Sequence, residues 1–392
     1  MKRTILIGGV LCLVLLGGYG ITRMLLPTPR QSVAPHTQSP PVTTKPVAPQ
    51  IRFAAMGDML AHDSIVNNAR TADGYDFTRY FATIKPLYSD ADVVFCNPET
   101  PAAGTALGIS GYPTFNAPSE FPRDLSKVGC NMINLATNHM YDKGQAGIDG
   151  TLSVWREQKP LAIAGANSSS ADSEMVSYFT KNGLKVAFVA FMDFSNTPVP
   201  NAYSVESYHD KEKTKAKLVT ARKNADVVIV SAHWGTEDSS VINEDQKSAA
   251  QFFADAGVDV VIGTGPHVLQ PVARVSGANG HSTLVWYSIG NMLSSQLKLE
   301  ELTSGVASFT VIKKDGRINV EKLGFQPTFM AYDWPAADRA AEKLSSRTNL
   351  MLYPLSDAGD RLKTMFPGET VASRQQYIMK TLGSDSGVTF AP

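Results

Sequence analysis

The stretch Ile51-Arg52-Phe53-Ala54-Ala55-Met56-Gly57-Asp58 contains the pattern that predicts the fold of this chain. A short, mostly apolar run is followed at once by a glycine and a carboxylate. Such a run is typical of a strand that is buried on both faces of a sheet. The acidic residue would then stand at the carboxyl end of the strand, where the functional groups of α/β proteins gather.

The same pattern recurs along the chain. Further runs rich in Val, Ile and Phe predict buried strands at residues 91–96, 131–136, 185–191, 225–232, 258–262 and 283–287. Amphipathic stretches that suit helices separate them, at residues 77–88, 120–128, 145–157, 211–224 and 244–256. Residues 305–324 alternate around Lys314-Asp315-Gly316, which predicts a β-hairpin. We therefore expect one α/β domain over residues 51–330, followed by a mostly helical C-terminal extension over residues 331–392.

Composition narrows the class of protein. The 392 residues carry a formal net charge of zero, so the chain lacks a broad basic field and we expect no nucleic-acid partner. With 43% hydrophobic residues it can bury a sizeable core. Cys96 and Cys130 have no CxxC spacing, which argues against a thiolate zinc site. A bridge between them and two separate buried thiols both fit the sequence, and we favour the separate thiols.

The N-terminus predicts a membrane anchor. Residues 4–22 carry no charge, and at about 1.5 Å per residue they span about 28 Å, close to the thickness of a bilayer core. Lys2 and Arg3 precede the run, so the N-terminus should stay in the cytoplasm. A cleaved signal peptide is the alternative, but no clear A-x-A site follows. Either reading exports the rest of the chain, and the anchor makes it a single-pass protein of the cell membrane with an extracytoplasmic domain.

A proline-rich segment separates the anchor, residues 1–26, from the predicted domain. Residues 27–50 contain seven prolines together with Thr, Ser and Gln. Such a composition favours extended polyproline geometry over a packed fold. We interpret residues 27–50 as a disordered stalk between the membrane and the domain.

Polar and titratable side chains follow nearly every predicted strand. They comprise Asp58, His62, Asn97, Glu99, Asn138, His139, His233, Glu237, His267 and Asn291. Because the carboxyl ends of strands meet in one crevice, we expect these side chains to share a site. Imidazole, carboxylate and amide oxygen suit a divalent transition metal, namely Mn²⁺, Zn²⁺ or Fe²⁺, as one or two ions. A pair of ions could bind a phosphate-like oxyanion and generate a hydroxide nucleophile.

Each of these residues also has a structural interpretation. Asp58 could cap the helix that follows it. Asn97 and Asn138 could form turns, and His233 could be a structural, partly buried histidine. The consistent placement of the whole set at strand ends favours a shared site. The other three histidines fall in the linker or in polar loops, where we expect them to be solvated, and these are His36, His209 and His281.

The same residues occur in ordered motifs that resemble the CapA family of poly-γ-glutamate capsule biosynthesis proteins. The resemblance covers residues 51–330, and the motifs are Gly57-Asp58 with His62, Asn97-Pro98-Glu99, Asn134-Leu135-Ala136-Thr137-Asn138-His139 with Asp142-Lys143-Gly144, His233-Trp234-Gly235-Thr236-Glu237, Gly265-Pro266-His267-Val268-Leu269-Gln270 and Tyr287-Ser288-Ile289-Gly290-Asn291. That family is in turn similar to calcineurin-like metallophosphoesterases, which implies a four-layer α/β/β/α sandwich with two metals.

This resemblance implies roles for individual residues. Asp58 would bind the first metal, and Glu99 would stand where a bridging aspartate is usual. Asn138 would bind the second metal, and His139 would be the acid beside the leaving group. His233 and His267 would be further ligands.

The chain also departs from the phosphoesterase pattern. The usual Asp-x-His is Asp58-Met59-Leu60, so the nearest histidine is His62, four residues beyond the aspartate. The bridging position is Glu99, and the final histidine pair is reduced to His267.

Three functions fit the sequence. The first is a membrane-anchored component of poly-γ-glutamate capsule synthesis and export that works with other membrane subunits and with the anionic polymer. The second is a free-standing metal-dependent hydrolase of a phosphoester or an amide. The third is a non-catalytic module that binds an anionic polymer.

Overall fold

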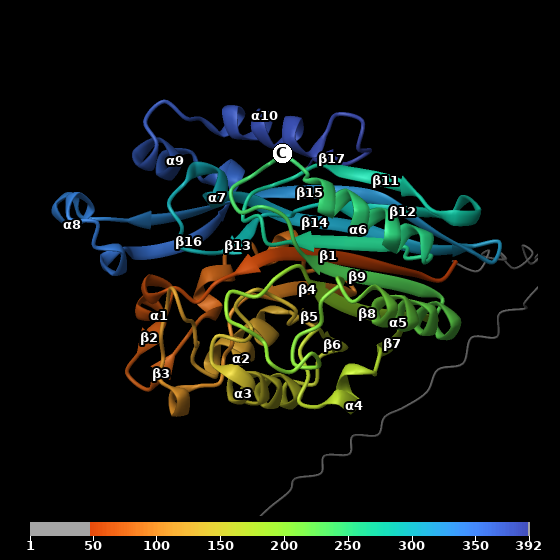
Figure 1. Cartoon of the computed structure of the whole chain (residues 1–392). Helices are drawn as coiled ribbons and strands as arrows, with labels where there is room; N and C mark the ends of the chain where they lie inside the picture. The colour runs from red at the N-terminus through yellow and green to blue at the C-terminus, as the bar shows by residue number, and fades with distance from the viewer. Residues whose placement is uncertain (1–47, 391–392) are drawn as a thin grey trace, which may run out of the picture. The chain divides into compact units, whose positions relative to one another are not determined.

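Two β-sheets carry the fold of the computed structural model, which describes residues 48–390 (Figure 1). The first sheet has the order β16-β15-β14-β1-β4-β5-β6, with β13 beside β1 and β17 beside β15. Its strands are β1 (Gln50–Met59), β4 (Val93–Pro98), β5 (Met132–Asn134), β6 (Ala162–Ala164), β13 (Asn291–Leu293), β14 (Thr303–Lys314), β15 (Arg317–Asp333), β16 (Thr348–Pro354) and β17 (Thr389–Phe390).

The second sheet has the order β11-β12-β10-β9-β8-β7. Its strands are β7 (Ser177–Lys181), β8 (Leu184–Met192), β9 (Val227–His233), β10 (Val260–Thr264), β11 (Val272–Ser276) and β12 (Ser282–Trp286). The four strands β8, β9, β10 and β12 run parallel to one another, as their buried sequences predict. A separate ribbon pairs β2 (Arg70–Thr71) with β3 (Gly74–Tyr75).

The two sheets pack face to face. Along β8, Val186, Phe188 and Ala190 point into the core that is shared with the first sheet, whereas the residues between them point to a second core. Aromatic contacts join the two layers. The ring of Phe188 meets that of Phe95 on β4 at 6.2 Å between centroids, and Trp286 stacks on Phe325 at 6.3 Å. Because successive side chains of a strand point to opposite faces, a fully buried strand such as β8 contributes to both cores.

Helices cover the outer faces of the sandwich. α5 (Lys211–Asn224) contacts β8 and β9, and α6 (Glu244–Asp255) contacts β11 and β12. On the first sheet, α2 (Glu120–Val128) and α3 (Gly144–Glu157) bury apolar residues in the same core as β4 and β5. The shorter helices are α1 (Asp63–Ala69), α4 (Ser170–Ser173), α7 (Leu299–Leu302), α8 (Ala336–Ala340) and α9 (Gly359–Met365), and α10 (Val371–Leu382) follows them. The expected α/β sandwich is thus confirmed.

Most of the predicted elements have a counterpart in the structure. Each of the seven predicted strands is present, and the hairpin consists of β14 and β15. The helix predicted at residues 77–88 is wrong, because this stretch forms two 3₁₀ turns, Thr78–Phe81 and Lys85–Leu87, with Pro86 unable to donate within a longer helix. Other 3₁₀ turns are Thr105–Leu107, Ala278–Gly280, Leu344–Ser346 and Leu355–Asp357.

The chain after Met330 is more than a helical extension. β15 continues to Asp333, β16 pairs with β15 in antiparallel fashion, and β17 adds a short parallel pairing at Gly324 and Phe325. Ile378 and Leu382 of α10 are buried in the same hydrophobic core as the residues of the first sheet. Residues 331–390 are therefore integrated with the sheet that contains β1.

Cys96 and Cys130 form a disulfide, so the expectation of two separate thiols is wrong. Cys96 lies in β4 and Cys130 lies just before β5, the strand that pairs with β4. This pairing brings the two Cα atoms to 5.7 Å, which is within the usual range for a bridge.

The predicted membrane anchor, residues 4–22, and nearly all of the stalk lie outside the described residues. Between residues 48 and 390, no helix has the length and apolar character needed to cross a membrane.

Candidate metal centre

Strand register places three polar side chains side by side on the first sheet. Asp58 near the end of β1 is aligned with Asn97 on β4 and with Asn291 on β13. The pairing shifts between Met56 and Asp58, so Gly57 lies at an irregularity of the strand. A Cβ atom on Gly57 would lie 1.8 Å from the carbonyl oxygen of Gly290, which is why only glycine fits there.

The second sheet contributes histidines at the same edge. His233 ends β9 and is aligned with Thr264 at the end of β10. The loop after β10 places Gly265 and His267 opposite the end of β1, where the amide N–H of Gly265 donates to both oxygens of Asp58, at 3.2 and 3.1 Å. His267 has a φ of 62°, a left-handed conformation that is uncommon for a residue with a Cβ atom. Such a conformation is kept where the surrounding structure demands it.

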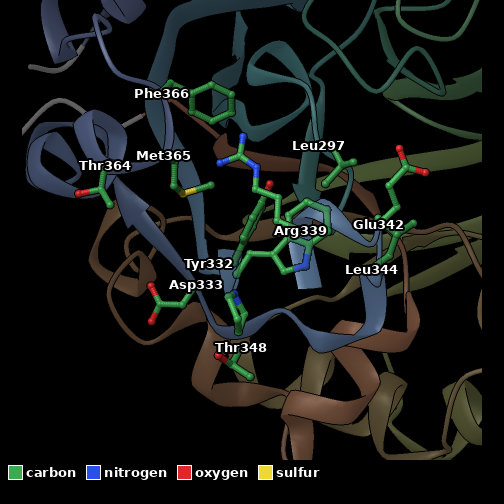
Figure 2. A pocket seen from close by; sticks show the side chains of 12 residues that line it. Leu297, Tyr332, Asp333, Arg339, Glu342, Leu344, Thr348, Thr364, Met365 and Phe366 are labelled. Atoms are coloured by element: carbon green, nitrogen blue, oxygen red, sulfur yellow. The ribbon is translucent and has the colours of Figure 1, made fainter. Parts of the chain in front are cut away.

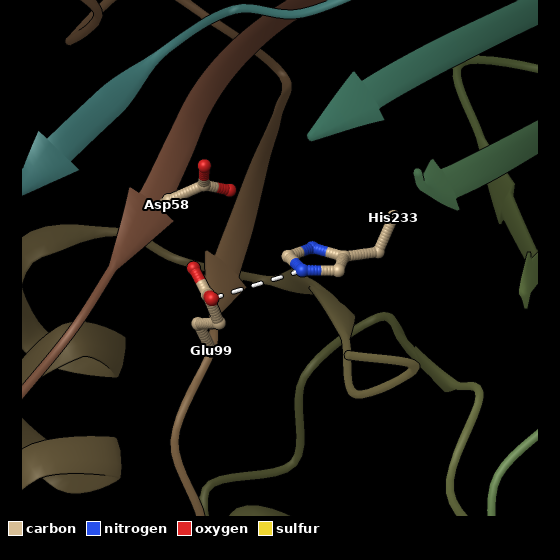
Figure 3. A group of neighbouring side chains, drawn as sticks. All are labelled: Asp58, Glu99 and His233. Atoms are coloured by element: carbon tan, nitrogen blue, oxygen red, sulfur yellow. Dashed lines mark ion pairs between the residues drawn. The ribbon is translucent and has the colours of Figure 1, made fainter. Parts of the chain in front are cut away.

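Asp58, Glu99 and His233 form a compact group. Each offers one ligand atom, these atoms all lie within 4.8 Å of one another, and all three residues are buried. Figure 3 shows the two carboxylates and the imidazole ring directed toward one shared space. Carboxylate from the first sheet and imidazole from the second sheet thus converge between the ends of the strands.

Hydrogen bonds orient the members of this group. Asn97 donates to Asp58 through Nδ2 at 2.7 Å, and Asn134 donates to the side-chain oxygen of Asn97 at 2.6 Å. His233 bonds through Nε2 to Oδ1 of Asn138 at 3.0 Å, and its Nδ1 lies 3.0 Å from the hydroxyl of Thr264. One neutral tautomer, with the proton on Nε2, satisfies both contacts of His233.

Glu99 is the exception, because both of its carboxylate oxygens are buried and neither has a hydrogen-bond partner among residues 48–390. His233 and His267 approach them only to 3.7 and 3.8 Å, which is too far for a hydrogen bond. Burial raises the pKa of the Glu99 carboxyl well above its usual value, against the opposing pull of His267. An unsatisfied buried carboxylate is costly, so Glu99 fits a site that holds a cation.

The pKa values of the two neighbouring histidines, His233 and His267, shift in opposite directions. Burial lowers the pKa of His233 to about 4, although Asp58 opposes the shift. Burial also acts to lower the pKa of His267, but the carboxylates of Glu99 and Asp58 outweigh it and raise that pKa to about 10. The Nδ1 of His267 faces two acceptors at 3.1 Å, Asp58 and Asn291, as a protonated nitrogen would. A ring held as a cation beside two carboxylates supplies part of the positive charge that this site demands.

The residues fit a divalent metal ion. Oxygen and nitrogen donors of the required types converge, and the described part of the chain offers the oxygens of Glu99 no hydrogen-bond donor. Asp58, Glu99 and His233 would hold the ion, and Asn138 and His267 lie in direct contact with members of that group. A bound ion would neutralise Glu99 and supply Lewis-acid polarisation of an oxyanion.

His139 lies beside this centre with its own supporting contacts. Its Nδ1 lies 2.8 Å from Oδ2 of Asp142, and that oxygen also accepts from the amide N–H of Phe115. Nε2 lies 3.1 Å from Nδ2 of Asn196. The carboxylate keeps the proton of Nδ1 in place, so Nε2 is the atom at which His139 could take up or release a proton.

Two of the predicted site residues stand apart from the group. His62 precedes α1, and its ring meets Phe115 edge-on at 5.3 Å. Its buried Nδ1 has no hydrogen-bond partner within the described ranges of the chain. Burial lowers the pKa of His62 to about 3, and the charges of His267 and Arg347 act in the same direction. Glu237 is exposed and makes no side-chain hydrogen bond within residues 48–390. Neither residue belongs to the group of three potential ligands.

Some site residues could not be singled out from the sequence. Asn134 lies inside a predicted strand rather than after it, and Asn196 lies in a loop without a motif. Thr264 stands between two glycines and carries no motif signal of its own. Asp142 had the clearest signal, since it follows His139 by three residues within one motif.

The prediction that the remaining histidines are solvated holds for His209 and needs correction for His281. His209 is exposed, its Nε2 lies 2.6 Å from Oδ1 of Asp193, and these two residues form a second group of potential ligands with Asp245. His281 is partly buried, and its Nε2 bonds to the carbonyl oxygen of Val258 at 2.8 Å. His36 lies outside the part of the chain that the structure describes.

The fold and the site define a two-sheet α/β protein with a buried carboxylate–histidine centre at the carboxyl edge of its strands. Residues 52–296 match the family model described as "Bacterial capsule synthesis protein PGA_cap", which is more than half of the chain. This chain therefore belongs to that family of bacterial capsule synthesis proteins, and the resemblance to the CapA family is confirmed.

Two relatives support the assignment. The chain is 29% identical over 241 residues to the PGA biosynthesis protein CapA of Bacillus subtilis (strain 168), covering 60% of this chain and 62% of the relative. It is 30% identical over 188 residues to the capsule biosynthesis protein CapA of Bacillus anthracis, covering 46% of this chain and 44% of the relative. The matches thus span less than two thirds of either relative.

Solved structures show weaker likeness. The calcineurin-like phosphoesterase YfkN from Bacillus subtilis aligns with a TM-score of 0.43 and 16% identity, covering 85% of this chain and 98% of that chain. A 5′-nucleotidase from Candida albicans SC5314 aligns with a TM-score of 0.39 and 13% identity, covering 70% of this chain and 51% of that chain. The family assignment rests on the sequence matches.

Proposed function

We propose that this protein is a membrane-anchored, extracytoplasmic component of capsule synthesis and export, with poly-γ-glutamate as the polymer. The observation that carries the proposal is the family match over residues 52–296. The relatives named for capsule or PGA biosynthesis support the same role. The chain would act beside the membrane with other subunits of the machinery and with the anionic polymer.

Two features support the extracytoplasmic location. The uncharged run at residues 4–22 follows Lys2 and Arg3, an arrangement that favours a cytoplasmic N-terminus and an exported domain. The disulfide between Cys96 and Cys130 belongs to an oxidising compartment, because thiols stay reduced in the cytosol.

Surface polymer on living cells tests this role. A strain that lacks the gene should lose its surface poly-γ-glutamate and regain it when the full chain is supplied. Supplying the Glu99→Gln chain should fail to restore the polymer if the metal centre serves that role, while equal protein levels on immunoblots would exclude loss by degradation. A deletion strain with an unchanged capsule would rule out the proposed function.

The buried carboxylate of Glu99 favours a second function, that of a metal-dependent hydrolase of a phosphoester or an amide. Asp58, Glu99 and His233 would hold the ion, and Nε2 of His139 would hold the proton that a leaving group needs. General acid catalysis by such a residue contributes about 10²–10⁴-fold to the rate. His139→Ala should therefore lower turnover in that range in the presence of Mn²⁺ or Zn²⁺ and leave metal content unchanged. A wild-type protein that holds metal but hydrolyses no phosphoester or amide would exclude this function.

A further inference from the structure

A groove of about 780 Å³ opens beside the C-terminal part of the first sheet (Figure 2). Tyr332, Trp334 and Phe366 line it with aromatic surface. Leu297 and Leu344 also line it, and they are 40% and 47% exposed. Its volume falls within the range of about 300–1,000 Å³ that ligand sites occupy.

A cationic side chain from α8 projects into this groove. Figure 2 shows the guanidinium group of Arg339 on the side of Phe366, away from the carboxylate of Glu342. Arg339 is exposed and forms no ion pair within residues 48–390. Asp333 also lines the groove, but its charge is balanced by Arg361, whose Nη2 lies 2.7 Å from Oδ1 of Asp333. Glu342 lines the other side of the groove and has no ion pair within the described residues, so the lining has a cationic side at Arg339 and an anionic side at Glu342.

A second guanidinium lies beneath the aromatic wall. Arg347 is buried, with its Cζ atom 5.2 Å from the ring centroid of Tyr332 and 5.5 Å from that of Trp334. Its donors reach the carbonyl oxygen of Leu344 at 2.8 Å and Ser295, and no carboxylate pairs with it in the described part of the chain. A buried cation without a counter-charge adds positive potential to the surface above it.

The groove lies at the same edge of the first sheet as the metal centre. β15 runs antiparallel to β14, which runs antiparallel to β1, so the carboxyl ends of β15 and β1 share one edge. The segment from Asn291 to Leu297 connects the two sites. Asn291 contacts His267 and donates to Gln296 at 2.7 Å, and the next residue, Leu297, lines the groove.

We propose that this groove binds a segment of an acidic polyamide chain and holds it beside the metal centre. A side-chain carboxylate of the ligand pairs with Arg339, and its methylene groups pack on Trp334, Tyr332 and Phe366. Charge complementarity selects the carboxylate, and aromatic surface next to it suits the short apolar links between successive carboxylates. The choice of a polyamide rests on the proposed function, whereas the location of the site rests on the groove itself.

Binding of soluble poly-γ-glutamate fragments to the purified full-length protein tests the proposal. Tryptophan fluorescence should change on titration, because Trp334 lies in the groove. Arg339→Gln should weaken binding at least about tenfold, as expected for loss of a charge-assisted contact. Arg317→Gln removes the same charge at the far end of β15 and should leave the affinity unchanged. Trp334→Ala should also weaken binding, whereas Trp334→Phe should retain most of it.

Several results would contradict the proposal that the groove binds the polymer. These are equal affinity of the wild-type and Arg339→Gln proteins, no binding by the wild type, tighter binding of polyphosphate than of poly-γ-glutamate, or loss of binding after treatment with EDTA. The capsule of a deletion strain decides the proposed function separately. If the deletion strain loses its capsule but binding does not depend on Arg339, only the proposed binding site is wrong. If the deletion strain keeps its capsule, only the proposed function is wrong.

Discussion

Glu99 and His233 are an acid and a base that are buried in the same space. Burial raises the pKa of the Glu99 carboxyl and lowers the pKa of the His233 imidazole, so it disfavours the charged form of both groups. A divalent ion would favour the charged form of Glu99, because the negative carboxylate would then have a partner. The site is thus best suited to a state in which a cation is bound, which is why metal binding and folding should be coupled.

In the metal-free protein, the titration of His233 should appear as a loss of stability in acid. Its pKa is about 4 in the folded state against 6.5 for an ordinary histidine. Between these values the unfolded chain takes up a proton that the folded chain excludes, so the free energy of unfolding falls as the pH drops from 6.5 toward 4. Each pKa unit corresponds to about 1.4 kcal/mol. Urea unfolding at a series of pH values measures this slope.

The variant His233→Gln serves as the reference for that measurement, because it lacks the titrating group. The difference in unfolding free energy between wild type and variant should change across this window and stay constant above about pH 7. A constant difference across the whole range, or an NMR titration of His233 with an ordinary midpoint, would contradict the assignment of a buried neutral ring.

The sequence predicts the identity of these residues better than their environment. Asp58, Glu99 and His233 each follow an apolar run, and that position alone indicates the edge of the sheet where they meet. Whether an oxygen has a partner depends on distances between segments far apart in the chain. The orphaned state of Glu99 and the separation of His62 from the ligand group therefore required the structure.

At the level of secondary structure, the irregular strand β1 positions Asp58. Its Gly57 packs against the backbone of Gly290, and Asp58 donates its amide N–H to the same carbonyl at 3.0 Å. The close approach of these two segments aligns Asp58 with Asn291. A side chain at residue 57 would push β1 and β13 apart.

Gly57→Ala should consequently destabilise the protein by about 3 kcal/mol or more, since the clash is with backbone that cannot rotate away. Gly359→Ala is a matched control, because its Cβ would meet Val371 at an ordinary 3.7 Å. Urea denaturation of both variants gives the comparison. Equal stability of Gly57→Ala and wild type would show that β1 and β13 are not held as close as the structure has them.

The disulfide between β4 and β5 should contribute strongly to stability. It joins residues 34 apart in sequence, and a loop of that size predicts a loss of about 3–4 kcal/mol on reduction. Urea denaturation with and without a reductant measures the loss. Under denaturing conditions without reductant, only Cys12 of the three cysteines should react with a thiol reagent. Three reactive thiols in freshly isolated protein would contradict the bridge.

Continuous apolar runs made the central strands predictable, because a strand buried on both faces must be apolar at nearly every position. The edge strands gave weaker signals. β16 alternates between buried and partly exposed residues and ends at Pro354, and β17 has only two residues. The 3₁₀ turns at residues 78–87 resemble an amphipathic helix in composition, and Pro86 was the one residue that indicated otherwise.

For the molecule as a whole, both candidate sites lie at the edge of the first sheet where β1 and β15 end. The metal centre lies between the two sheets, and the aromatic groove lies beside β15. An acidic chain held on Arg339 would lie at the same edge of the first sheet as the end of β1, which carries Asp58. This arrangement suits a protein that handles a long anionic polymer as it leaves a membrane machine, which is the role proposed here.

The metal content of the purified full-length protein tests the central claim most directly. After incubation with Mn²⁺, Zn²⁺ or Fe²⁺ and removal of free ions, elemental analysis should find one or two of these ions per wild-type chain. Glu237→Gln, an exposed carboxylate at the same edge, should retain them, and Glu99→Gln should lose them. A wild-type protein that takes up none of the three ions, or a Glu99→Gln variant that binds as much metal as the wild type, would contradict the account.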